Sequence, residues 1–279
     1  GSKIVVMSHW DPEEALRLIA AERVTMFTGV PTMLWDILNK AHLESADLSS
    51  LTNIGTGGQA LPVNLLDAIR SACPQAFMGT GYGLTETSGS VAQAVGEDFI
   101  RNRTAAGRVL SLVDMKIDAP EGQAGEIMVR GPMVMKGYWN RPEETAAVLS
   151  ADGWFRTGDI GMVDNEGYIF IVDRKKDMVI SGGENIYCAE VERIMGAMDG
   201  VAECAAFGIP DERLGELLVA FVVGSGVTEQ EIIQEVGEKL ARYKAPGHVR
   251  FVSEPLPRNA VGKVDKIKLR AMWPDLAGV

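Results

Sequence analysis

Apolar residues in the first hundred positions form short runs that alternate with segments of helical periodicity. Asp11-Pro12-Glu13-Glu14 is typical of a helix start, because aspartate caps the first free N–H groups and proline fits the first turn. Strands that alternate with short helices predict an α/β layer built on a parallel sheet. The pattern places strands at 4–7, 24–30, 53–58 and 76–78, and helices at 12–21, 31–38 and 62–71.

The pattern changes at about residue 107. Short strands now lie between Gly, Pro and Asp-Gly turns, which is typical of a small, twisted β subdomain. Asn140 is the predicted cap of one helix that interrupts this region. The strands are predicted at 113–118, 125–130 and 167–172, and the helix at 142–149.

The charged segment 173–177 is typical of a solvated linker between domains. A smaller α+β unit is predicted beyond it, where Thr228 and Glu231 form a capping box at the start of a helix. Further elements are predicted at 189–197, 201–209 and 217–223. The expected fold is therefore an α/β region at 1–106, a small β-rich subdomain at 107–172, a linker at 173–177 and an α+β C-terminal domain at 178–279.

Composition narrows the class of protein. The 279 residues are 46% hydrophobic, which excludes disorder, and the longest apolar run, 217–223, is too short to span a membrane. No signal peptide is visible, and three cysteines cannot form a disulfide framework, so a cytoplasmic, reducing compartment is expected. The net charge of −11 argues against a general nucleic-acid binder. Residues 242–270 nevertheless contain eight basic and two acidic residues, which favours either a local anionic ligand or a solvated cationic surface.

The segment 79–87 follows a predicted strand and is rich in glycine. Glycines allow sharp bends and close approach of a ligand to the backbone. Thr85 offers a hydroxyl for a phosphate oxygen, and Glu86 offers a hard oxygen ligand for Mg²⁺ shared with phosphates. The alternative is a simple turn with a helix cap at Thr85 or Thr87.

Tyr82-Gly83-Leu84-Thr85-Glu86 resembles a central signature of the adenylate-forming family, which contains acyl-CoA synthetases, luciferases and peptide-synthetase adenylation domains. Further segments match in the family's order, and the resemblance covers nearly the whole chain. Each segment is a weak signal alone, whereas the ordered set is specific. The segments are 27–33, 56–62, 125–139, 153–159, 173–177, 181–187 and 257–263.

The resemblance implies a set of catalytic and nucleotide-binding residues. Lys263 is implied to bridge the α-phosphate and the substrate carboxylate, where a preorganised cation stabilises developing charge. Asp159 is implied to accept hydrogen bonds from both ribose hydroxyls, and Arg174 to hold the ribose or α-phosphate. Alone, Asp159 could equally be a turn aspartate and Arg174 a surface linker residue. The implied nucleotide pocket also contains Gly79, Thr80, Gly81, Tyr82 and Gly83, with Thr85 and Glu86 as catalytic residues and Glu86 as the Mg²⁺ ligand.

The resemblance also implies sites for the other substrates. Gly57, Gly58 and Gln59 are implied to line an acyl pocket. Phe27 could be a wall of that pocket or a core residue. The second domain is implied to rotate about a hinge at Lys176 between the two half-reactions. The implied pantetheine loop contains Gly182, Gly183 and Glu184, and Cys188 is expected to be a core or surface thiol.

The implied activity is that of an AMP-forming, ATP-dependent acyl-CoA synthetase. Its implied substrate is a carboxylic acid, and a fatty acid is favoured. ATP, Mg²⁺ and CoA are the expected co-substrates, with no tightly bound cofactor, nucleic acid or membrane span. The family's phosphate loop is not found in this sequence, so the chain is expected to be a C-terminal portion that needs an N-terminal part of the same enzyme and is inactive alone. The alternatives are a ligase that loads a carrier-protein thiol and a non-catalytic nucleotide- or CoA-binding module.

Overall fold

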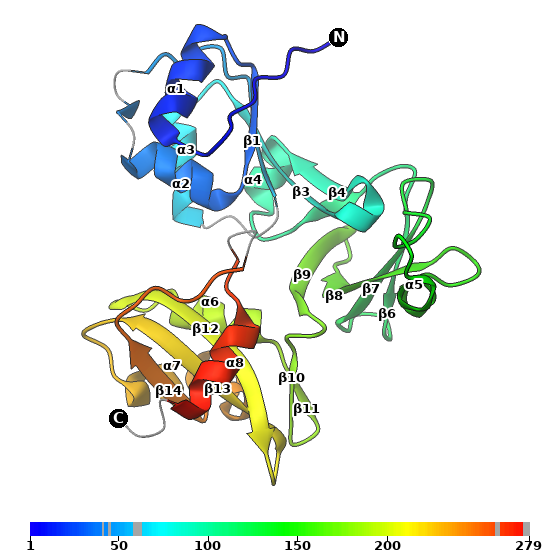
Figure 1. Ribbon diagram of the computed structural model, residues 1–279, viewed down its shortest axis with the longest axis vertical. Coiled ribbons are helices and arrows are strands. Elements are labelled where there is room, and N and C mark those ends of the chain that lie inside the picture. The colour runs from blue at the N-terminus through cyan, green and yellow to red at the C-terminus, as the bar shows by residue number, and fades with distance from the viewer. Residues whose placement is uncertain (41, 44–45, 58–62, 260–262, 276–279) are drawn as a thin grey trace. The chain divides into compact units, whose positions relative to one another are not determined.

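The computed structural model describes residues 1–40, 42–43, 46–57, 63–259 and 263–275 (Figure 1). The chain divides into two compact units. Unit 1 consists of Gly1–Thr157 and Gly161–Ile171, and unit 2 consists of Gly158–Ile160 and Val172–Val279.

Unit 1 begins with three helices that pack on one face of three parallel strands. Asp11 accepts a hydrogen bond from the N–H of Glu14 at 3.0 Å, so the predicted helix start is confirmed. Ile54 and Met78 are register partners, and both are buried beneath the helices. The helices are α1 (Pro12–Ala21), α2 (Pro31–Lys40) and α3 (Val63–Ala72), and the strands are β1 (Met26–Gly29), β2 (Asn53–Gly57) and β3 (Phe77–Leu84).

The opposite face of these strands is open. Met26, Phe77 and Val95 are each more than 60% exposed, and the strand register places them on the same face. Parallel strands are normally covered on both faces. The described residues of this chain thus cover only one face of the parallel part of the sheet.

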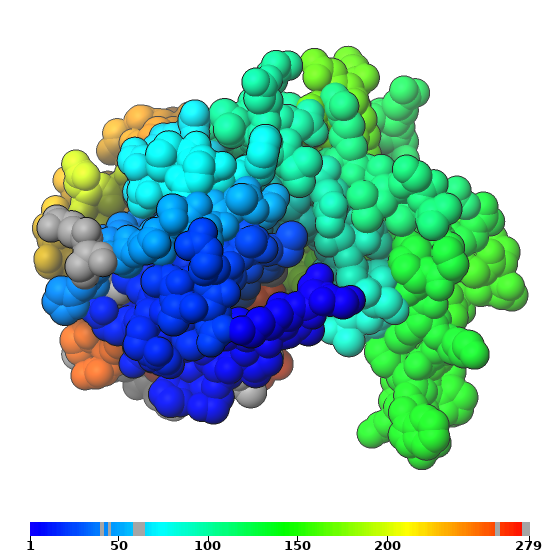
Figure 2. All heavy atoms as spheres, turned by 90° about the horizontal axis from the view of Figure 1, so that it is seen from above, coloured from blue at the N-terminus to red at the C-terminus, as the bar shows by residue number. Residues whose placement is uncertain are grey.

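The remaining strands of this sheet make it mixed, so the predicted parallel sheet is correct only for β1 to β3. Two of these strands, β8 and β9, also contribute residues 158–160 and 172–174 to unit 2. The nine-stranded order is β1-β2-β3-β4-β5-β9-β8-β7-β6, and the β3–β4, β4–β5, β5–β9 and β6–β7 pairs are antiparallel. In Figure 2 the green segment that contains β6, β7 and α5 projects from the blue and cyan remainder of unit 1. These further elements are η2 (Thr85–Thr87), β4 (Gly89–Val95), α4 (Glu97–Arg101), β5 (Gly107–Val109), β6 (Asp114–Asp118), β7 (Gly125–Arg130), α5 (Pro142–Val148), β8 (Phe155–Val163) and β9 (Tyr168–Arg174).

Two local predictions in unit 1 are wrong. Residues 4–7 form no strand, and Ile4 and Val6 are both 81% exposed. Arg141, not Asn140, is the N-cap of α5, and Asn140 instead has a left-handed φ of 54° in the preceding turn. The apolar run at 4–7 pairs with no described strand, and asparagine is favoured both as a helix cap and in the left-handed conformation, so its residue type alone did not distinguish the two.

Unit 2 contains a sheet with helices on both faces, and Figure 1 shows α8, in red, lying across β12 and β13. The sheet order is β11-β10-β13-β12, with β14 beside β13. The Thr228–Glu231 capping box is confirmed by hydrogen bonds in both directions. The elements are β10 (Val179–Ser181), β11 (Glu184–Ile186), α6 (Cys188–Met195), β12 (Val201–Asp211), β13 (Gly215–Gly224), α7 (Glu229–Lys239), η3 (Arg242–Lys244), β14 (His248–Val252) and α8 (Lys266–Asp275).

The unbroken apolar run at 217–223 reflects burial on both faces of β13. Leu218 and Ala220 point into the core beneath α6 and α7, whereas Val219 and Phe221 point into the core beneath α8. Trp273 of α8 packs its ring 5.2 Å from the ring of Phe221. A strand between two helical layers needs apolar residues at every position, which is why no alternation is seen.

Candidate active site

The glycines at 79, 81 and 83 lie in strand β3, whereas the turn that the sequence offered as an alternative begins only at Thr85. None of the three has a left-handed φ. They serve instead to admit strand β4, because a Cβ at Gly81 would lie 2.8 Å from the Oγ of Ser90 and one at Gly83 would overlap the carbonyl of Gly89. Thr80 and Tyr82 lie between these glycines on the other face of the strand.

Thr85–Thr87 form a single 3-10 turn that closes the β3–β4 hairpin. The turn is held by Thr87, which is buried and whose Oγ1 accepts from the N–H of Leu84 at 2.9 Å. The capping function that the sequence left open between two threonines therefore belongs to Thr87. Thr85 is exposed at the start of the turn.

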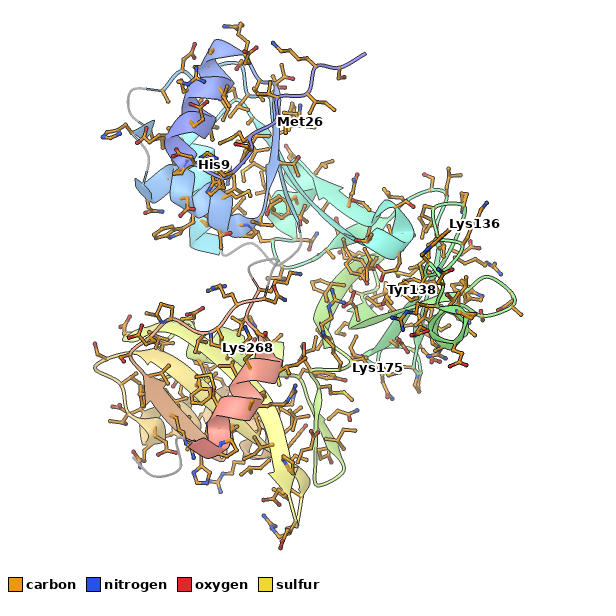
Figure 3. All side chains as sticks on the ribbon, in the orientation of Figure 1. His9, Met26, Lys136, Tyr138, Lys175 and Lys268 are labelled. Atoms are coloured by element: carbon orange, nitrogen blue, oxygen red, sulfur yellow. The ribbon has the colours of Figure 1, made fainter. Side chains whose placement is uncertain are left out.

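Glu86 is held by the segment that leads into α5. Its carbonyl accepts a hydrogen bond from the N–H of Met135 at 2.7 Å, and its Oε1 accepts one from the hydroxyl of Tyr138 at 2.9 Å. Figure 3 labels Tyr138 in this part of unit 1. Burial, followed by the hydrogen bond to Glu86, raises the pKa of Tyr138. Tyr138 lies in a segment that matches the family signature, yet spacing alone did not reveal its contact with a residue 52 positions earlier.

Asp159 lies within strand β8, not in a turn, and its side chain is 3% exposed. Its Oδ1 lies 2.7 Å from the Nε of Arg174, which is 45% exposed at the end of β9. The N–H of Lys175 donates to the carbonyl of Gly158 at 2.8 Å, which fixes the two strand segments together. Two residues that the sequence nominated separately therefore form one ion pair with a buried acceptor and a partly exposed planar cation.

Strand β8 is anchored to β7 immediately before Asp159. The buried hydroxyl of Thr157 donates to the carbonyl of Ile127 at 2.8 Å. Arg156 contacts the buried carboxylate of Glu126 at 2.7 Å and also contacts Asp118. These contacts fix the position of the strand that presents Asp159.

The segment 173–177 is not a fully solvated linker, because Asp173 is 7% exposed. Burial raises the pKa of this carboxyl, although it accepts hydrogen bonds from the N–H groups of Arg174 at 2.7 Å and Ala189 at 3.2 Å. Lys176 follows in an exposed turn. The charged pattern correctly indicates exposure for Arg174 and Lys176 and misses the inward-facing carboxylate between strand and turn.

Lys263 is exposed in unit 2, close to the start of α8. Its carbonyl accepts from the N–H of Asn259 at 2.8 Å, and its own N–H donates to the Oδ1 of Asn259 at 3.0 Å. Arg258 and Val264 form an isolated antiparallel bridge. The segment that carries Lys263 is therefore closed at its base like a hairpin.

The residues assigned to the acyl pocket are only partly described. Phe27 packs among the buried residues beneath α1 and α2, with its ring 6.2 Å from that of Trp10. Gly57 ends strand β2, and a Cβ there would meet the carbonyl of Gly81 at 3.5 Å. Gly58 and Gln59 lie outside the described residues.

The assigned pantetheine loop is the tip of the β10–β11 hairpin. Gly182 and Gly183 have φ values of 60° and 88°, which a two-residue hairpin turn between Ser181 and Glu184 requires. Glu184 is exposed beside them. Cys188, which follows, is buried and donates to the carbonyl of Asp177 at 3.0 Å, so it is a core thiol.

Within the part of the chain that the structure describes, no group of three or more His, Cys, Asp or Glu side chains could hold a metal ion. Among the same residues, no helix has the length and apolar character needed to cross a membrane.

The chain is similar to known protein families and to individual proteins. Residues 1–139 match the family described as AMP-binding enzyme, and residues 190–263 match the one described as AMP-binding enzyme C-terminal domain. A propanoyl:CoA ligase of Mycobacterium tuberculosis, named for a methyl-dioxo-octahydroindenyl group, is 43% identical over 276 residues, which are 98% of this chain and 54% of that protein. A long-chain-fatty-acid–CoA ligase of the same species is 38% identical over 280 residues, 98% of this chain and 55% of that protein.

A solved structure gives the same result for the fold. The o-succinylbenzoate CoA synthetase MenE from Bacillus subtilis, in complex with the acyl-adenylate intermediate OSB-AMP, matches with a TM-score of 0.82 and 34% identity. The match covers 94% of this chain and 54% of that one. The chain spans about half the length of the curated relatives it matches.

Proposed function

Because this chain belongs to the AMP-binding enzyme family, we propose that it acts in the AMP-forming activation of a carboxylic acid and in transfer of the acyl group to the thiol of CoA. The reaction has two steps. The acid's carboxylate attacks the α-phosphate of ATP and releases pyrophosphate, and the thiol then attacks the acyl carbon and releases AMP. The observation that carries the proposal is the Asp159–Arg174 pair in unit 2.

This pair suits the sugar-phosphate part of a nucleotide. A carboxylate accepts hydrogen bonds from two neighbouring hydroxyls, and the buried position of Asp159 strengthens each of them. Arg174 carries planar donors that can bind a phosphate or ribose oxygen while Nε keeps its contact with Asp159. In this proposal Asp159 binds the ribose hydroxyls, and Arg174 orients Asp159 and contacts the sugar or α-phosphate.

The hairpin end at Thr85 and Glu86 supplies groups for phosphate and Mg²⁺. Mg²⁺ in nucleotide sites is usually held by one or two carboxylates together with phosphate oxygens and water. Glu86 would bind the ion, with Tyr138 orienting its carboxylate from the other oxygen. Bound Mg²⁺ would neutralise phosphate charge that develops during adenylyl transfer.

Different residues of unit 2 are proposed to act in the adenylation step and in the thiol-transfer step. Lys263 brings a flexible ammonium to the α-phosphate and the attacking carboxylate, where it stabilises the transition state. The glycines at 182 and 183 give a narrow hairpin tip that a pantetheine arm can pass. Lys176 is the proposed hinge of a mobile domain at 178–279, and this rotation would exchange the Lys263 segment for the hairpin tip between steps.

The acid is proposed to be largely apolar. One of the two M. tuberculosis relatives is named for a fused-ring propanoyl group, and the other is named for long-chain fatty acids. The acids that correspond to these two names each carry a large apolar body. We therefore propose a fatty or polycyclic acid as the substrate class.

Titration calorimetry of this chain with AMP, 2′-deoxy-AMP and a non-hydrolysable acyl-adenylate mimic tests the proposal. We expect AMP to bind, and the 2′-deoxy compound and the Asp159→Asn variant each to weaken binding about tenfold or more, because a hydrogen bond to a charged group is worth about 1.5–3 kcal/mol. Asp199→Asn, an exposed loop change in the same unit, is the matched control and should leave affinity unchanged. Equal binding of AMP and 2′-deoxy-AMP, or no binding of either nucleotide, would overturn the assignment.

A further inference from the structure

Three charged side chains meet in the interior of unit 2, away from the nucleotide-binding pair itself. Lys266, the first residue of α8, is 14% exposed, and its Nζ lies 2.8 Å from the Oε1 of Glu192 on α6. Asp173, at the end of β9, is 7% exposed and interacts electrostatically with Lys266. Charges this deeply buried are costly unless they are paired and hydrogen-bonded, so the surrounding structure has to hold them in place.

Each carboxylate in this cluster is fixed by backbone donors from a different element. Asp173 accepts from the N–H of Ala189, in the first turn of α6, as well as from its own neighbour Arg174. Glu192 accepts from the N–H of Ala206 on β12 at 2.9 Å. The cluster therefore connects β9, α6, β12 and α8.

The charge state of Lys266 follows from its surroundings. Burial alone lowers its pKa, but Glu192 first, together with Cys188 and Asp173, outweighs burial and leaves the pKa of Lys266 raised. Burial raises the pKa of both Glu192 and Asp173, and the ammonium of Lys266 opposes this. The ammonium of Lys266 thus partly offsets the effect of burial on both carboxylates.

The two ends of this cluster lead to the two halves of the proposed site. Lys266 follows Lys263 by three residues, and the N–H of Asp265 between them donates to the carbonyl of Pro257 at 2.8 Å. Asp173 directly precedes Arg174, which contacts Asp159. Two residues separate Lys266 from Lys263, and Asp173, with which Lys266 interacts, is adjacent to Arg174.

We propose that Lys266 is a positioning residue that couples the segment carrying Lys263 to the Asp159–Arg174 pair through Glu192 and Asp173. The functional meaning of this coupling rests on the proposed nucleotide chemistry, whereas the coupling itself is a property of unit 2. Removing the ammonium loosens both ends together, and weakening Asp173 loosens the Lys263 segment, because coupling between two sites is reciprocal.

Amide hydrogen exchange of the whole chain tests the coupling directly. In Lys266→Met we expect amide exchange about tenfold or more faster than in the wild type at Asp265 and Lys263, and also at Ala189 at the start of α6. The amides of β13 serve as the internal reference and should not change. Asp173→Asn should speed exchange at Asp265, and Lys266→Arg should restore wild-type protection. The matched control is Lys239→Met on α7, whose side chain is 53% exposed and contacts Glu235 of its own helix. Faster exchange confined to 257–265, or a uniform change that includes β13, overturns the proposal.

AMP titration separates this proposal from the proposed function. We expect Lys266→Met and Asp173→Asn each to raise the Kd for AMP several-fold, and the double variant to be no weaker than the weaker single one. A purely structural role for Lys266 would leave the Kd unchanged in the folded variant and would overturn the coupling. Failure of the wild-type chain to bind AMP would instead overturn the nucleotide function and leave the exchange result to decide the coupling.

Discussion

Two ion pairs in unit 1 have almost the same length and differ in burial. The Arg156–Glu126 pair spans 2.7 Å and the Arg17–Glu14 pair spans 2.6 Å. The carboxylate of Glu126 is 7% exposed, whereas that of Glu14 is 43% exposed. If burial decides what an ion pair contributes, replacing the two arginines must have very different effects on stability.

The expected loss in the free energy of unfolding depends on which charged group remains without its partner. Removing one partner of a buried pair costs about 3–5 kcal/mol, because the other charge stays buried. Arg156 is itself 40% exposed and water already screens part of the interaction, so we expect Arg156→Met to lower the free energy of unfolding by about 2 kcal/mol. Arg17→Met exposes no buried charge and is expected to have no measurable effect.

Urea unfolding followed by tryptophan fluorescence measures this difference. Four of the five tryptophans, Trp10, Trp35, Trp139 and Trp154, belong to unit 1, so the signal reports mainly on that unit. With an m-value of about 2 kcal/mol/M, the midpoint for Arg156→Met should fall by about 1 M.

A double-mutant cycle with Glu126→Gln completes the test. We expect the two changes at Glu126 and Arg156 to be non-additive by about 1 kcal/mol, because each removes the same interaction. Equal midpoint shifts for Arg17→Met and Arg156→Met, or strictly additive effects at Glu126 and Arg156, would refute the reasoning that burial controls the contribution.

Three further predictions concern other parts of the chain. Thr228→Ala removes one half of the capping box with Glu231 and should destabilise unit 2 by about 1 kcal/mol in thermal unfolding. Phe77→Lys places a charge on the open apolar face of the parallel strands and should reduce fluorescence of a bound hydrophobic dye, while the wild type binds it. Burial raises the pKa of Cys188 and of Cys204 to about 12, above the ordinary value near 9, so the unfolded chain loses these protons first and stability should fall as pH rises from about 9 to about 12. Replacing both cysteines by alanine should make that fall less steep.

Local signals predicted the fold where the deciding interaction is itself local. The cap at Asp11 and the capping box at Thr228 are formed by residues three positions apart, so the sequence contains both partners. The strand at 79–83 was missed because glycine locally favours turns, whereas here β4 requires glycine for close approach. Helix α8 was missed because its buried residues, Leu269 and Trp273, occur only once per turn within a basic segment.

The candidate site shows the same limit. Asp159 and Arg174 could be named individually from their segments, but their ion pair depends on strand β8, which the sequence pattern did not predict. Tyr138 and Glu86 are 52 residues apart, so no spacing rule connects them. The roles of Lys263, Lys176 and the hairpin glycines stay predictions, because they concern a reaction and a movement.

The contacts of the buried Asp173 carboxylate bear on which orientation about the proposed hinge is favoured. Asp173 precedes Lys176, whereas its partners Ala189 and Lys266 follow it. A rotation about Lys176 would therefore separate this carboxylate from an N–H donor and from its cation. Leaving a buried acceptor without its partner costs about 1–3 kcal/mol, a factor of about 5 to 150 in population. If Lys176 is the hinge, the orientation in which Asp173 is bound would be favoured without ligand, and contacts with nucleotide or CoA would have to supply about that difference to populate the rotated orientation.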